Sequence, residues 1–262
     1  MDETYQTYVN RVAGLSLPGK YGSQLQNIQE SPKFKSHTEG KTEPAPFPGY
    51  SVITPPWGEE SENTEFYSNL KAFQQQLLQQ LNQGLLLPVP PESFHLTLAD
   101  LIWEEAYREV VRKNPEFEEQ LRWHIAESFQ QYQQFADKSS PVQWQLLGLM
   151  IRPRALNVCL VPKDEASYQR ILQLRRSIYQ NANLIELGIE QQYHFTAHIT
   201  LGYFGKISPD LDRASLAKTL AALDQHWLET EPQVLKIHRA ELRKFEDMTR
   251  FEREPHWPML EF

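Results

Sequence analysis

Two four-residue segments of this 262-residue chain repeat one pattern. His95-Leu96-Thr97-Leu98 lies in the first half and His198-Ile199-Thr200-Leu201 in the second, and both have the order His, apolar, Thr, Leu. Polar and apolar residues alternate around each copy, as in a β-strand with one buried face. Because side chains alternate between the faces of a strand, each His and its Thr should project from the same face, about 6.5–7 Å apart. The repeat therefore predicts two matched pairs of polar side chains carried on strands.

Two such pairs have the groups that phosphoryl transfer needs. An imidazole titrates near ~6.5, so one ring can act as a base while a second acts as an acid on the opposite side of a reacting centre. Threonine hydroxyls can donate hydrogen bonds to oxygens that gain negative charge. In-line attack, protonation of the leaving group and support of the phosphate oxygens are then all available without a metal ion or other cofactor.

A zinc site is the main alternative for the second copy. His194 and His198 are four residues apart, a spacing typical of zinc ligands on a helix. The alternation here has period two, however, no glutamate follows in the metalloprotease pattern, and Cys159 is the chain's single cysteine. We therefore expect no metal, and we place His194 on the face or rim of a strand.

The elements that must position these residues are mixed. The patterns predict strands at 50–54, 85–89, 94–98, 142–151, 156–161, 194–204, 234–245 and 249–254. They predict helices at 62–81, 103–135 (broken near Asn114-Pro115), 165–180 and 210–228. We expect 85–89 to pair with 94–98, and 142–151 with 156–161. Hairpins mixed with helices in each half indicate an α+β fold with antiparallel sheets.

The N-terminal residues differ from the rest. Residues 1–48 are polar with scattered Pro, Gly, Ser and Lys, which predicts an arm that packs on or flanks the core, with disorder as the alternative. The compact domain is expected at 49–262.

Composition limits the classes of function. The net charge of -8 argues against binding to long duplex nucleic acid but permits a small phosphate ligand or one end of an RNA strand. The N-terminus lacks the basic and apolar regions of a signal peptide, and no apolar run approaches the ~20 residues of a membrane helix. One cysteine permits no intrachain disulfide. We expect a cytoplasmic monomer that does not bind membranes.

The paired segments resemble the 2H phosphoesterase superfamily, which includes RNA 2′,3′-cyclic phosphodiesterases and 2′-5′ RNA ligase-like proteins. Residues 195–204 resemble its second motif, and residues 46–53 with the preceding arm resemble a less characterised branch. The resemblance covers about 44–262, although a long insertion around 104–140 departs from the minimal pattern. It implies two lobes related by a pseudo-twofold axis, each an antiparallel sheet backed by helices, with the active cleft between them.

By the same resemblance, His95 and His198 are the acid–base pair, and Thr97 and Thr200 contact the phosphate. The implied activity is hydrolysis of a cyclic phosphate, on a small cyclic nucleotide or an RNA 2′,3′-cyclic phosphate end. A 2′-5′ RNA ligase-like activity and a non-catalytic module that binds nucleotides or RNA ends are the alternatives.

Residues near the motifs are secondary candidates. Trp103 and Tyr203 each lie just past a motif and are candidates for stacking on a base or ribose, although either could be a core or rim aromatic. Arg152 and Arg154 flank the turn of a predicted hairpin. A solvated hairpin tip is their simplest interpretation, and contact with a second phosphate is the alternative.

Overall fold

The computed structural model describes residues 2–36, 42–135, 141–229 and 233–262. Residues 37–41 of the predicted arm and 136–140 of the predicted insertion lie outside the described residues. The α-helices are α1 (Tyr5–Ala13), α2 (Tyr21–Leu25), α3 (Thr64–Gln80), α4 (Glu104–Lys113), α5 (Phe117–Phe135), α6 (Glu165–Tyr179), α7 (Ala182–Glu186) and α8 (Arg213–Leu228). Single 3₁₀ turns are η1 (Pro18–Lys20), η2 (Trp57–Glu59) and η3 (Pro91–Ser93). The strands are β1 (Phe34–Ser36), β2 (Thr42–Pro44), β3 (Gly49–Ile53), β4 (Leu86–Pro88), β5 (Thr97–Trp103), β6 (Val142–Arg152), β7 (Ala155–Pro162), β8 (His198–Phe204), β9 (Val234–Ile237), β10 (Arg239–Phe245), β11 (Phe251–Glu252) and β12 (Met259–Glu261).

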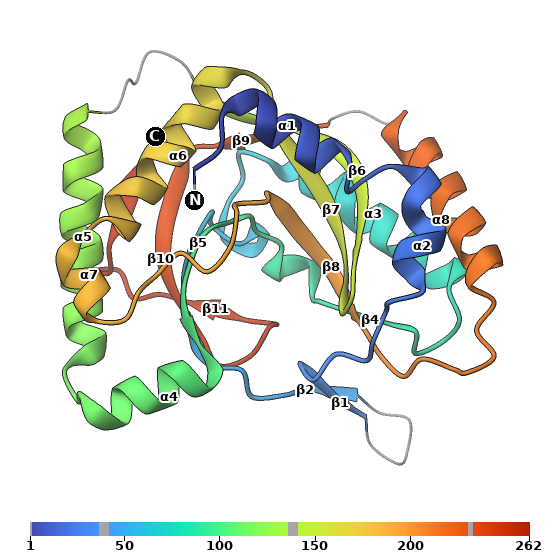
Figure 1. The fold of residues 1–262 in the computed structure, drawn as a ribbon, viewed down its shortest axis with the longest axis horizontal. Helices are drawn as coiled ribbons and strands as arrows, with labels where there is room; N and C mark the ends of the chain where they lie inside the picture. The colour runs from blue at the N-terminus through green and yellow to red at the C-terminus, as the bar shows by residue number, and fades with distance from the viewer. Residues whose placement is uncertain (1, 37–41, 136–140, 230–232) are drawn as a thin grey trace.

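Two five-stranded antiparallel sheets form two lobes (Figure 1). The first lobe has the strand order β11-β10-β3-β5, with β12 also paired to β10, and the second has the order β4-β8-β7-β6-β9. Helices α5 and α7 lie outside the first sheet, and α2 and α8 lie outside the second (Figure 1). The predicted α+β fold with antiparallel sheets in two lobes is therefore confirmed.

The chain exchanges strands between the lobes, which corrects two sequence predictions. Segments 85–89 and 94–98 do not pair, because β4 joins β8 in the second sheet while β5 joins β3 in the first. The 3₁₀ turn that contains Pro91 separates them. The predicted strand 234–245 is also two strands, since β9 pairs with β6 in the second lobe and β10 pairs with β3 in the first.

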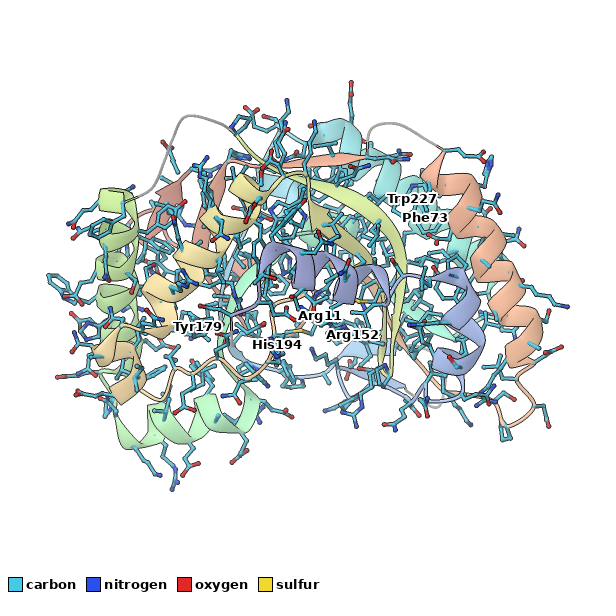
Figure 2. The ribbon with its side chains drawn as sticks, turned by 45° about the horizontal axis from the view of Figure 1, so that its top comes forward. Arg11, Phe73, Arg152, Tyr179, His194 and Trp227 are labelled. Atoms are coloured by element: carbon cyan, nitrogen blue, oxygen red, sulfur yellow. The ribbon has the colours of Figure 1, made fainter. Side chains whose placement is uncertain are left out.

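Buried apolar side chains from both sheets form the hydrophobic core. In the second lobe, the rings of Phe73 from α3 and Trp227 from α8 stack with centroids 4.0 Å apart (Figure 2). The N-terminal segment also contributes to the core, since Tyr8 and Val12 of α1 are fully buried and Tyr8 packs edge-on against Trp144 of β6. No helix in the described part of the chain is long and apolar enough to cross a membrane.

Strand β5, which begins at Thr97, is an edge strand that is stabilised by a helix of the second half of the chain. No strand of the described residues pairs with its outer carbonyl groups, and such groups need other partners when they are buried. The buried guanidinium of Arg175 in α6 donates to the Leu98 carbonyl at 2.6 Å, and the Tyr179 hydroxyl donates to the Asp100 carbonyl at 2.7 Å. Helix α6 therefore fixes the strand that carries the first motif.

Replacing Arg175 tests how much its hydrogen bond to Leu98 contributes to stability. We expect Arg175→Met to lower the free energy of unfolding by roughly 1–3 kcal/mol, because it leaves the buried Leu98 carbonyl without its donor. Arg176→Met is the matched control, since Arg176 is an exposed neighbour that pairs with Asp2, and an exposed pair contributes less than about 1 kcal/mol. Urea unfolding of both variants compares the two losses, and equal losses would contradict this role for Arg175.

Candidate active site

A cavity of about 280 Å³ is lined by side chains from both lobes. It is lined by all six residues singled out from the sequence: His95, Thr97, Trp103, His198, Thr200 and Tyr203. The structure thus brings together two segments that lie 103 positions apart in the chain.

The two motifs have the same local pattern of burial. Leu96 and Ile199 are completely buried, whereas the His and Thr on either side of each are only partly buried. Both strands begin later than predicted, however. His95 lies two residues before β5, and β8 begins only at His198, so that His194 lies in the preceding loop.

Both imidazole rings are oriented by the same contact. The Nδ1 atom of His95 lies 2.7 Å from the Ser93 carbonyl oxygen, and that of His198 lies 2.7 Å from the Thr196 carbonyl oxygen. A carbonyl only accepts, so Nδ1 carries the proton and Nε2 of the neutral ring carries the lone pair. In each motif, Nε2 is therefore the nitrogen that can exchange a proton with a substrate.

The loop before His198 is held by the N-terminal helix. Arg11 of α1 donates to the Thr196 hydroxyl at 2.9 Å and to the Phe195 carbonyl at 2.6 Å, and it forms an ion pair with Glu3. The Tyr8 hydroxyl accepts from the Ala197 backbone N–H at 3.0 Å. Helix α1 thus positions the segment whose carbonyl orients the second imidazole.

Both rings are neutral at pH 7. Burial, with smaller contributions from His198 and Arg243, lowers the pKa of His95 to about 4. Burial, with contributions from Arg152 and Lys33, also lowers the pKa of His198 to about 4. Their Nδ1 contacts act in the opposite direction because they favour the charged ring. An anion bound near the rings would likewise raise both pKa values.

Strand irregularities bring further residues of each strand into the cavity. The pairing of β5 with β3 shifts register, and Thr97, Asp100 and Trp103, spaced by three, all line the cavity. The pairing of β8 with β7 shifts similarly, which lets Thr200 and Tyr203 line it together. A strict period of two would place Asp100 on the opposite face from Thr97. Such bulges re-aim side chains and explain why the sequence pattern missed Asp100.

The second threonine is already hydrogen-bonded. The Thr200 hydroxyl donates to Asn157 Oδ1 at 3.0 Å, and Asn157 is buried in β7. To donate to a bound phosphate, this hydroxyl must rotate away from Asn157.

Several cavity residues were not predicted. The ring of Phe251 meets the ring of His95 edge-on with centroids 4.2 Å apart. Tyr193 also lines the cavity, and its hydroxyl donates to Asp100 Oδ2 at 2.6 Å. Lys33 and Phe47 come from the N-terminal 48 residues. Phe251 lies in the predicted strand 249–254 and Phe47 in the segment 46–53 that resembles a branch of the superfamily, but neither pattern assigned these residues to the site.

The candidates near the motifs have different environments. Tyr203 lines the cavity, but it is mostly buried, with the Lys33 ammonium 5.0 Å from its ring centroid. Arg152, at the end of β6, also lines the cavity and lies in the central part of the molecule (Figure 2). A solvated tip is therefore wrong for Arg152, although its neighbour Arg154 is exposed.

His194 is not among the residues that line the cavity, and it is half-exposed with Nδ1 4.0 Å from Glu3 Oε2. In the described ranges of the chain, no group of three or more His, Cys, Asp or Glu side chains is arranged to hold a metal ion.

Comparisons with known proteins give a family match for part of the chain and a shared fold. Residues 33–122 match the 2H phosphodiesterase family model, described as a domain of unknown function (DUF1868). A conserved protein of unknown function from Agrobacterium tumefaciens str. C58, ATU0111, is 17% identical, with 90% of this chain and 96% of that chain covered and a TM-score of 0.61. This likeness shows a shared fold.

Two further solved structures are less similar to this chain. LigT of E. coli, in a complex with 3′-AMP, is 16% identical over 82% of this chain and 98% of its own, with a TM-score of 0.44. TT0787 of Thermus thermophilus is 17% identical over 80% of this chain and 91% of its own, with a TM-score of 0.42. No curated protein sequence matches this chain.

Proposed function

Because residues 33–122, which include the first His-x-Thr-Leu segment, match the 2H phosphodiesterase family model, we propose that this protein is a metal-independent cyclic phosphodiesterase. The family match confirms the resemblance to the 2H phosphoesterase superfamily. The proposed substrate is a 2′,3′-cyclic phosphate, on a small nucleotide or at an RNA end. One observation supports the proposal most strongly: two imidazoles with matched Nδ1 contacts share a cavity with two threonine hydroxyls.

The proposed reaction uses both rings at Nε2. One ring takes a proton from water as the water oxygen bonds to phosphorus, and the bond from phosphorus to one ribose oxygen breaks. The other ring, protonated beforehand, gives its proton to that departing oxygen. Thr97 and Thr200 donate to the phosphate oxygens as their negative charge grows.

A panel of cyclic phosphodiesters tests this proposal. We expect hydrolysis of adenosine 2′,3′-cyclic phosphate to a single monophosphate isomer, little turnover of the 3′,5′-cyclic isomer, and unchanged rates in EDTA. Incubating RNA fragments with 2′,3′-cyclic phosphate and 5′-hydroxyl ends then shows whether longer products form, as a ligase would give. Tight binding of cyclic nucleotides without any ring opening would contradict an enzymatic role.

The lowered pKa values predict an acidic optimum. The active form of the pair carries one proton, and with both pKa values lowered to about 4 this form is most abundant well below pH 6.5. We therefore expect kcat/KM, which reports the free enzyme, to be highest on the acidic side of pH 6.5 and to fall as pH rises. The kcat profile should be displaced to higher pH, because the bound phosphate anion raises the imidazole pKa values. Steady-state kinetics between pH 4 and 9 measures both profiles, and a kcat/KM optimum above pH 7 would count against the assignment.

A further inference from the structure

The cavity that is lined by His95 and His198, called the reaction cavity below, continues into a second, outer compartment. This outer compartment, of about 680 Å³, is open to the reaction cavity, because both are lined by His198 and Thr200 as well as by Lys33, Phe47, Trp103, Arg152 and Tyr203. It also reaches Arg154 and Ser31. The two spaces are therefore adjacent, and a ligand whose phosphate lies between the two imidazoles can extend into the outer one.

The outer compartment concentrates positive charge in an acidic protein. Three cationic side chains line it, Lys33, Arg152 and Arg154, and Glu104 is the single carboxylate among the described residues of its lining. The chain as a whole has a net charge of -8. Positive charge gathered beside a cavity in an otherwise acidic protein attracts anions to that position.

These cations form no close ion pair with a carboxylate in the described structure, although the charges of Asp100 and Glu104 act on Lys33. Among residues 2–36, 42–135, 141–229 and 233–262, no ion pair involves Lys33, Arg152 or Arg154. The Lys33 ammonium instead lies 4.4 Å from the ring centroid of Phe47 and 3.3 Å from the Met248 sulfur. Burial lowers the pKa of Lys33 to about 8, because a cation removed from water without a close counter-ion is costly, and an arriving anion would relieve that cost.

The backbone fixes these cations in place. The Gln29 N–H donates to the Pro153 carbonyl at 2.6 Å and the Ser31 N–H donates to the Phe204 carbonyl at 2.8 Å. The first bond ties the segment before Lys33 to the β6–β7 hairpin tip that carries the two arginines, and the second ties it to the end of β8. The three segments that carry these cations are thus joined by backbone hydrogen bonds.

We propose that the outer compartment binds a second phosphate of the substrate, so that the preferred substrate is a nucleotide with a 5′-phosphate in addition to its 2′,3′-cyclic phosphate. This inference rests on the proposed function, because the reaction cavity must hold the cyclic phosphate. Arg152 and Arg154 bind the second phosphate by charge-assisted hydrogen bonds, and Lys33 lies at the boundary between the two phosphates.

Kinetics on matched substrates tests the proposal. We expect 5′-phosphoadenosine 2′,3′-cyclic phosphate to have a kcat/KM roughly 10- to 100-fold above that of adenosine 2′,3′-cyclic phosphate, the effect of one or two charge-assisted hydrogen bonds. The preference should shrink as salt is added. A dinucleotide that ends in a 2′,3′-cyclic phosphate carries an internucleotide phosphodiester instead of the 5′-monophosphate. Its kcat/KM shows whether the outer compartment binds a phosphodiester as well as a 5′-monophosphate. Equal rates for all three substrates would overturn the second site while leaving the proposed function intact.

Single substitutions test whether Arg154 is responsible for the preference for a 5′-phosphate. Arg154→Gln should reduce the preference for the 5′-phosphate about tenfold, because Arg154 lines the outer compartment and not the reaction cavity. Arg112→Gln is the control, since Arg112 is an exposed arginine in the last turn of α4 and lines neither cavity. This variant should prefer the 5′-phosphorylated substrate as strongly as the wild type does. The same loss in both variants would show a general charge effect and would refute the site.

Equilibrium binding separates the two proposals. Calorimetry compares adenosine 3′,5′-bisphosphate with adenosine 3′-monophosphate, and it needs no turnover. If no cyclic phosphate is hydrolysed but the bisphosphate binds more tightly and Arg154→Gln removes the difference, the catalytic proposal fails and the phosphate site stands. If cyclic phosphates are hydrolysed and the two nucleotides bind equally, the site fails and the catalytic proposal stands.

Discussion

Removing either imidazole should abolish most turnover. We expect His95→Ala and His198→Ala each to lower kcat for a 2′,3′-cyclic phosphate by roughly 10²- to 10⁴-fold, the usual contribution of a general acid or base. The two losses should combine to less than their product in the double variant, because a proton transfer that lacks one partner gains little from the other. Single-turnover kinetics at saturating enzyme measures the chemical step directly.

A second pair of variants separates chemistry from structure. In His95→Asn and His198→Asn, the amide N–H can take the place of Nδ1 and donate to the Ser93 or Thr196 carbonyl, while no group replaces Nε2. These variants should unfold at nearly wild-type urea concentrations and still lose turnover as the alanine variants do. His226→Ala is the control, because His226 is an exposed residue at the end of α8. If the asparagine variants keep more than a tenth of wild-type activity, Nε2 does not transfer the proton.

The repeat could predict that these four side chains line one cavity because its information is local. Alternation of polar and apolar residues is enough to place His95 and Thr97, or His198 and Thr200, on one side of a buried Leu96 or Ile199. The copy in each half then suggested that the two elements meet. Neither step requires knowledge of which strands pair. Both therefore hold although the predicted pairing of 85–89 with 94–98 is wrong.

What the sequence could not give depends on contacts between distant segments. Lys33 enters the cavity because backbone bonds tie the N-terminal segment to the β6–β7 hairpin tip and to β8. Arg175 supports β5 only because that strand lies at a sheet edge beside α6. Asp100 faces the cavity because of a register shift that the alternation of side chains does not encode. Each of these depends on tertiary packing and leaves no periodic signal.

The threonine hydroxyls should have the second largest effect. We expect Thr97→Val and Thr200→Val each to lower kcat by roughly 10²- to 10³-fold, as the loss of one hydrogen-bond donor to a developing oxyanion does. Thr97→Ser and Thr200→Ser retain the hydroxyl and should recover most of the rate. The Val and Ser variants of each position are compared by kcat and KM separately; a rise in KM alone would mean that the hydroxyls bind the ground state and the transition state equally.

The two threonines are not equivalent, and their difference is itself a test. Thr200→Val removes the donor that satisfies the buried Asn157 side chain, so this variant should also lose roughly 1–3 kcal/mol of stability. A purely structural role for Thr200 would make the loss of activity follow that loss of stability. Asn157→Ala distinguishes the cases, because it breaks the same hydrogen bond but leaves the Thr200 hydroxyl free to donate to the phosphate. If Asn157→Ala is destabilised yet retains turnover while Thr200→Val does not, the hydroxyl acts on the substrate; if both lose turnover equally, Thr200 acts through Asn157 and the packing of β7 against β8.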